Sequence, residues 1–219
     1  MIGKGKSISH GVAALEYDLA KEINGQAVAT EIARHELYGC TGAEMVQEMK
    51  PYHIDFPNVK NNCLRFEVSP SIEESATFTD ADWAELGNDF MQRMGLANHQ
   101  YIIIRHSGTE SKKEQAHLHI LANRVSLSGE LYRDNWIGKK ATEAANAIAK
   151  ERNFVQSQDI GKVNKAEIKE AMDGVLKKMQ GFDFTKFKEE LGKRGFKVRE
   201  ARASTGKLNG YYVTARSGT

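Results

Sequence analysis

Two histidines, His117 and His119, flank a single leucine near the middle of the chain. The run from residue 116 to residue 125 alternates in a way that is typical of a β-strand. Successive side chains on a strand point to opposite faces, so both imidazoles would project from one face, with Asn123 further along it. The apolar residues between them would face a core. Two imidazoles on one rigid strand face form half of a metal site.

A third histidine, His106, ends another apolar run that begins at Tyr101. The residues between the two runs are polar or small and contain Gly108, which predicts a hairpin loop. An antiparallel hairpin would bring His106 beside His117 and His119. Three imidazoles with open coordination positions are a ligand set for a catalytic transition metal. The alternative is that the histidine pair consists of ordinary polar residues on a half-buried strand.

The stretch from His106 to Val125, ending in His-Leu-His-Ile-Leu-Ala-Asn-Arg-Val, closely resembles the third motif of plasmid relaxases of the MobA/VirD2 type. These mobilization nucleases belong to the wider class with a histidine-hydrophobe-histidine motif. The resemblance extends from the N-terminal Gly-Lys-Ser segment to about residue 150. It implies an α+β fold with a central antiparallel β-sheet flanked by α-helices. It also implies that His106, His117 and His119 bind a divalent metal ion.

The same resemblance implies a function. The protein would be a metal-dependent, strand-specific relaxase that nicks DNA at an origin of transfer during conjugative mobilization. A tyrosine near the N-terminus would hold the 5′ end in a covalent phosphotyrosine intermediate. Mn or Mg is the expected metal for activity, and Zn or Ni also suits three histidines. The implied partners are single-stranded DNA, accessory mobilization proteins and a type IV secretion coupling protein, in the bacterial cytoplasm.

Tyr17 is the predicted nucleophile. Residues Gly11 to Glu22 are expected to be helical, with a narrow apolar stripe along one side. The stripe consists of Val12, Leu15, Leu19 and Ile23. Tyr17 lies roughly opposite that stripe, at ~100° of rotation per residue. Tyr38 and Tyr52, in loop-like segments, are the competitors, and a plain surface tyrosine is the alternative.

Glu67 is expected on the polar face of a strand within Asn62–Pro70, together with Arg65. Some relaxases carry an acidic residue near the metal on a comparable strand. Glu67 is therefore predicted to orient a ligand histidine or to assist proton transfer, the alternative being a solvated glutamate paired with Arg65. The family often has an aspartate two residues after the first histidine, where this chain has Gly108. Glu110 and Glu67 are the candidates to replace that carboxylate.

DNA contacts are predicted beside the histidines and in the C-terminal third. The residues chosen are Arg105, Asn123, Arg124 and Lys207. Asn123 could equally hold the metal region in place through structural hydrogen bonds. Residues 1–138 contain 13 lysines and arginines against 19 acidic residues, whereas residues 139–219 contain 18 against 10. This asymmetry favours the C-terminal third for contact with a DNA backbone.

The chain of 219 residues can bury a core as one large domain with a small appendage. Residues 1–154 would be the catalytic core. Residues 155–219 would form a helix-plus-hairpin unit behind a polar linker at Gln156 to Asp159, in a chain that is expected to be truncated. Helices are predicted at Thr79–Gly95, Lys139–Arg152, Val163–Gln180 and Asp183–Lys193, and further strands at Glu130–Arg133, Phe196–Arg199 and Tyr211–Thr214.

The sequence also argues against several other classes of protein. No run of 18 or more apolar residues predicts a membrane span, and no apolar signal region opens the chain. Two cysteines are too few for a disulfide framework. Two other functions stay open. In a replication-initiation nuclease of the same wider class the tyrosine lies after the histidine motif, as Tyr132, Tyr211 and Tyr212 do, and a non-catalytic DNA-binding protein could keep the fold.

Overall fold

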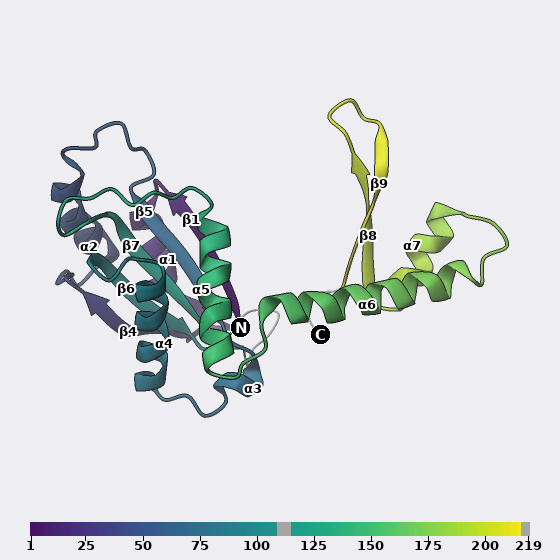
Figure 1. The fold of residues 1–219 in the computed structure, drawn as a ribbon, viewed down its shortest axis with the longest axis horizontal. Coiled ribbons are helices and arrows are strands. Elements are labelled where there is room, and N and C mark those ends of the chain that lie inside the picture. The colour runs from purple at the N-terminus through teal and green to yellow at the C-terminus, as the bar shows by residue number, and fades with distance from the viewer. Residues whose placement is uncertain (109–114, 216–219) are drawn as a thin grey trace. The chain divides into compact units, whose positions relative to one another are not determined.

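The computed structural model describes residues 1–108 and 115–215, which form two compact units, Met1–Ser157 and Gln158–Thr219. The first unit is built on a five-stranded sheet (Figure 1), whose strand order is β1-β5-β7-β6-β4 with every neighbouring pair antiparallel. The strands are β1 (Ile2–Ile8), β4 (Ala29–His35), β5 (Cys63–Ser69), β6 (His99–His106) and β7 (His117–Ser126). A short hairpin of β2 (Glu22–Ile23) and β3 (Gln26–Ala27) precedes β4. The expected α+β fold with a central antiparallel sheet is confirmed.

One face of the sheet packs against α4 (Asp80–Arg93) and α5 (Ile137–Glu151). Side chains such as Phe66, Phe90 and Ile120 fill this layer, and the short helix α3 (Ile72–Ser75) follows β5. The backbone of β1 approaches α5 closely because Gly3 has no Cβ; a Cβ there would come within 2.4 Å of the Ala141 carbonyl oxygen.

The opposite face packs against α1 (Gly11–Leu19) and α2 (Gly42–Met49), with the 3-10 turn η1 (Lys50–His53) after α2. Ile102, Ile104 and Leu121 form the sheet side of this second core. His117 and His119 share the face of Leu121 because side chains two residues apart on a strand point the same way. The histidines therefore lie on the sheet face that α1 covers.

Helix α1 begins at Gly11 as predicted, but its end and its buried side differ from the prediction. It ends at Leu19 rather than at Glu22, and Val12, expected in the apolar stripe, is 39% exposed. The buried side is instead made of Gly11, Ala14, Leu15 and Asp18. A charged residue thus occupies a core-facing position, which apolar periodicity cannot anticipate.

Other helix predictions are confirmed with small shifts. Thr79 caps α4 in a reciprocal pair with Asp82, and Gly95 follows the helix with a φ of 73°. The strand expected at Glu130–Arg133 is wrong, because only an isolated bridge between Val125 and Leu131 forms there.

The second unit contains α6 (Ser157–Leu176), α7 (Phe184–Lys193) and a hairpin of β8 (Phe196–Arg202) and β9 (Leu208–Ala215). Its core consists of Ala171, Val175, Phe187, Leu191 and Val198. The polar linker expected up to Asp159 is wrong in part, since Ser157 to Asp159 form the first turn of α6. Across the described ranges, no helix is long and apolar enough to cross a membrane.

Candidate active site

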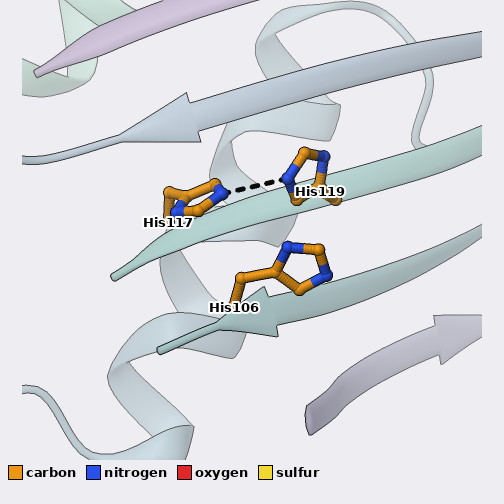
Figure 2. A group of neighbouring side chains, drawn as sticks. All are labelled: His106, His117 and His119. Atoms are coloured by element: carbon orange, nitrogen blue, oxygen red, sulfur yellow. Dashed lines mark hydrogen bonds between the residues drawn. The ribbon is translucent and has the colours of Figure 1, made fainter. Parts of the chain in front are cut away.

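The three histidines of the predicted metal site lie together at one end of the β6–β7 pair (Figure 2). His106 is opposite His117 in the antiparallel register, and His119 follows two residues later on the same face of β7. Each ring offers one nitrogen, and these nitrogens lie within 4.8 Å of one another. The closest pair is Nε2 of His117 and Nε2 of His119, 3.0 Å apart. The pairing of β6 with β7 thus brings the three histidines into one cluster of nitrogen donors.

Hydrogen bonds decide which ring nitrogens face the centre of the cluster. Nε2 of His106 donates to the backbone carbonyl of Asp18 at 2.7 Å, and Nδ1 of His117 donates to the carbonyl of Gln115 at 3.2 Å. In neutral rings these contacts leave a lone pair on Nδ1 of His106 and on Nε2 of His117. Figure 2 shows the second ring nitrogen of His106 turned toward the other two histidines.

The environment favours the neutral form of two of the three rings, His106 and His119. Burial lowers the pKa of His106. Burial lowers the pKa of His119 further, to about 2, and the nearby His106, His117 and Arg65 add to the shift. Neutral imidazole is the form that binds metals. Three converging imidazoles fit a divalent transition metal ion.

Asp18 lies directly against the cluster, although only 2% of its surface is exposed. Arg65 Nε donates to Asp18 Oδ2 at 3.0 Å, and Arg65 Nη2 bonds to Oδ1. Asp18 Oδ1 is also 3.7 Å from Nδ1 of His119. Burial raises the pKa of Asp18, an effect that the hydrogen bonds from Arg65 oppose.

Tyr17 immediately precedes Asp18 in the last turns of α1 and is 56% exposed. Lys21, one turn later, donates from Nζ to the Tyr17 hydroxyl at 2.8 Å. The competing Tyr38 is 77% exposed and donates to Glu36, which raises the pKa of Tyr38 and so disfavours its phenolate. Of these tyrosines, Tyr17 is the one whose chain neighbour contacts the histidines.

Glu67 is directly opposite His119 in the β5–β7 register, yet its carboxylate binds Lys4 Nζ at 2.8 Å. The predicted alternative pairing of Glu67 with Arg65 is wrong, because Arg65 pairs with Asp18. An open cleft of about 230 Å³ lies beside these residues. Its lining includes Lys4, Lys6, Arg65, Glu67 and His119. Glu110, the other carboxylate proposed from the sequence, lies outside the described residues.

Residues 17–154 match the family model for the nuclease domain of MobA/VirD2-like relaxases. The chain belongs to this relaxase family. The matched range includes Tyr17 and all three clustered histidines, so this relaxase is a DNA-nicking enzyme by family. A comparison with curated proteins found no match.

Among solved structures, the relaxase is distantly similar to the conjugative relaxase TrwC in complex with oriT DNA. The metal-free TrwC structure shares 10% identity over 94% of this chain and 74% of that chain, with a TM-score of 0.42. The metal-bound TrwC structure shares 11% identity over the same proportions, with a TM-score of 0.41.

Several residues chosen for DNA contact are engaged within the relaxase fold. Asn123 is fully buried, and its amide donates to the Met49 carbonyl and to Gln100, which favours the structural alternative. Arg124 binds two backbone carbonyls and Asp134, so within the fold it ties loops together. Arg105 pairs with Asp80. The sequence does not show these partners, because most of them come from distant segments and the others depend on how the loop after β7 folds back. Lys207 is exposed in the turn between β8 and β9.

The relaxase site contains three residues that the sequence analysis did not single out: Asp18, Lys21 and Lys6. A signal for Asp18 existed in its position, three residues after Leu15 on the buried side of α1. Lys21 is four residues after Tyr17, just beyond the end of α1, and its Nζ reaches the Tyr17 hydroxyl. Lys6 alternates with Lys4 on β1, so both project to the face of the histidines.

Proposed function

We propose that this relaxase cleaves one strand of single-stranded DNA at an origin of transfer, with Tyr17 as the nucleophile and a divalent metal ion held by His106, His117 and His119. The products are a 5′-phosphotyrosine linkage and a free 3′-hydroxyl. Residues 1–154 carry the chemistry, and the basic unit that follows contributes to strand binding.

The observation that carries the proposal is the junction of the histidine cluster with the end of α1. The three donors converge within 4.8 Å, and the residue after Tyr17 contacts two of them. A nucleophile and an electrophilic centre on adjacent elements are what phosphoryl transfer requires, because positioning supplies much of the rate.

The chain's own groups account for the transfer. The Tyr17 oxygen forms a bond to phosphorus while the bond from phosphorus to the 3′ oxygen breaks, and the 3′ oxygen takes a proton from solvent. Lys21, 2.8 Å from the Tyr17 hydroxyl, stabilises the negative charge that develops as the phenolic proton leaves to water. The phosphodiester energy is kept in the phosphotyrosine bond, so the strand can later be rejoined.

The cleft beside His119 is suited to a phosphate backbone. Lys4 and Lys6 extend from β1 and Arg65 from β5, all on the face that bears the histidines. Cations on one strand face bind successive phosphates without reading the bases. Glu67 binds Lys4 at the same cleft, so it reduces the net positive charge there and makes no bond to a histidine among those described.

A metal ion at the three histidines, when bound, would polarise a non-bridging phosphate oxygen and stabilise the charge that accumulates on it. Nδ1 of His106 and Nε2 of His117 are available for it. Neutral histidines suit Mn, Zn or Ni by ligand softness, and Mn or Mg is proposed for activity.

A strand-cleavage assay tests the proposal. Single-stranded oligonucleotides tiled across the DNA that flanks the protein's own gene are incubated with the protein and Mn²⁺. Wild-type protein should yield a free 3′-hydroxyl product that a chelator abolishes and Tyr17→Phe does not form. Binding of DNA and metal without any cleavage would instead support the non-catalytic alternative.

A further inference from the structure

Asp18 is the one described residue seen to contact two members of the histidine cluster through two different groups. Its backbone carbonyl accepts from Nε2 of His106 at 2.7 Å, and its carboxylate Oδ1 lies 3.7 Å from Nδ1 of His119. The carbonyl belongs to the last turn of α1, where helix carbonyls have no partner within the helix. His106 supplies the missing donor.

The geometry around His119 leaves a defined role for the carboxylate. A histidine that binds a metal through Nε2 carries its proton on Nδ1 and normally donates it to a carboxylate or carbonyl. Nε2 of His119 faces the cluster. Its Nδ1 lies 3.4 Å from Nη2 of Arg65, which is a donor, and 3.7 Å from Oδ1 of Asp18. Arg65 has only donors to offer, so when metal binding at Nε2 leaves the proton on Nδ1, Asp18 is the neighbouring acceptor for it.

The other carboxylate near His119 is engaged elsewhere. Glu67 is opposite His119 in register, but its carboxylate binds Lys4 Nζ at 2.8 Å on the neighbouring edge strand. Glu67 is also a third exposed, whereas Asp18 is buried at the cluster. Burial makes a charge-assisted hydrogen bond stronger and more specific.

We propose that Asp18 is the positioning residue of the site: its carbonyl orients His106, and its carboxylate orients His119, for metal binding. This inference rests on the proposed metal site. Because Asp18 follows Tyr17 in the same helical turn, the contacts that orient the ligands also fix the helix that carries the nucleophile. Arg65 holds the carboxylate in place by a two-pronged ion pair.

Metal affinity without DNA tests the proposal independently of nicking. Asp18→Asn keeps the backbone carbonyl and removes the anionic acceptor. Calorimetric titration with Mn²⁺ should show affinity reduced by ~10–100-fold. Glu67→Gln is the matched control, since it neutralises the other nearby carboxylate, and its affinity should stay within about twofold of wild type.

A buried arginine without its partner can destabilise the fold, so Asp18→Asn is accompanied by Asp18→Asn/Arg65→Gln, which removes both charges. The folded double variant should show the same loss of affinity. A folded double variant that binds Mn²⁺ within about twofold of wild type would overturn the proposal.

The wild-type protein offers a second readout. Nitrogen NMR of the Zn²⁺-loaded protein should find His119 protonated at Nδ1. The signal of this proton should shift strongly in Asp18→Asn and only slightly in Glu67→Gln. Protonation of His119 at Nε2 would contradict the assignment. Reduced metal affinity in Asp18→Asn combined with no cleavage by wild type would uphold the positioning role and reject the nuclease mechanism.

Discussion

His106 donates from Nε2 to the backbone carbonyl of Asp18 at 2.7 Å, although 88 residues separate the two. This bond joins the end of β6 to the end of α1, so the histidine cluster and the tyrosine helix form one unit. The site therefore depends on a contact between backbone and side chain that would survive most substitutions of residue 18.

Removing a cluster histidine should abolish tight metal binding. In His119→Gln we expect Mn²⁺ affinity to fall by more than the ~100-fold that loss of an orienting partner can produce, because a donor itself is gone. Titration calorimetry measures the loss. The control is His10→Gln, which changes an exposed histidine just before α1. If His119→Gln bound Mn²⁺ within about threefold of wild type, the cluster would not be the metal site.

Lys21→Gln should slow strand cleavage about 10-fold while leaving DNA and metal affinity unchanged. The cation at 2.8 Å supports charge on the Tyr17 oxygen, and a solvent-exposed partner contributes less than a buried donor does. Single-turnover rates at saturating DNA measure the effect. Lys139→Gln, on α5 across the sheet, is the matched control. Equal rates for the two variants would remove Lys21 from the mechanism.

Stability of the metal-free protein should fall as the pH drops below 6.5. The folded pKa of His119 is lowered to about 2, so below pH 6.5 the unfolded state binds more protons and is favoured. The contribution of neutral His119 to the free energy of unfolding is fully present above pH 6.5. Below pH 6.5 this contribution falls by about 1.4 kcal/mol per pH unit. Urea unfolding at pH 7.5 and 5.5 measures the loss, and His119→Gln should show a smaller one. An identical pH effect in both proteins would refute this origin.

The second unit should contribute salt-sensitive DNA binding through its hairpin. Lys197 and Arg199 lie on the face of β8 opposite its core side, Arg199 stacks over the exposed Tyr212, and Lys207 is in the turn. Replacing Lys197, Arg199 and Lys207 by Gln should lower the slope of log affinity against log salt by about 2.

The control for the hairpin variant carries the same loss of charge on helices of the same unit, at Lys165, Lys169 and Lys188. Fluorescence anisotropy with a labelled single strand measures both proteins. A larger change in the helix variant would move the DNA contact away from the hairpin. Tyr211 is not part of this surface, since it stacks on Phe184 at 4.4 Å.

Local patterns in the sequence were sufficient for most of the sheet and several helices. Alternation in β5 and the apolar run of β6 reflect how their faces pack, and the caps of α4 are local signals. The capping pair Thr41 and Glu44 of α2 was equally readable and was missed. Edge strand β4 was missed because its half-buried residues and the irregular pairing at Glu31 to Ala33 weaken the alternation.

The residues of the site could be predicted only where they lie close together in the sequence. The spacing of His117 and His119 predicts that both face one side of a strand, and the predicted hairpin places His106 beside them. The helix position of Asp18 predicts burial, but its role could not be assigned, because its partners Arg65 and His106 come from other strands. The same limit applies to Asn123, which binds the Met49 carbonyl 74 residues away, and to the contact of Arg124 with the Asn61 carbonyl.

The most direct test of the account is covalent capture at Tyr17. The protein is incubated with a cleavable single-stranded oligonucleotide and Mn²⁺, denatured and digested, and the DNA-bearing peptide is identified by mass. We expect the adduct on the peptide containing Tyr17, its loss with a chelator or in Tyr17→Phe, and its retention in Tyr38→Phe. An adduct that persists in Tyr17→Phe, or that maps to another tyrosine, would contradict the central claim.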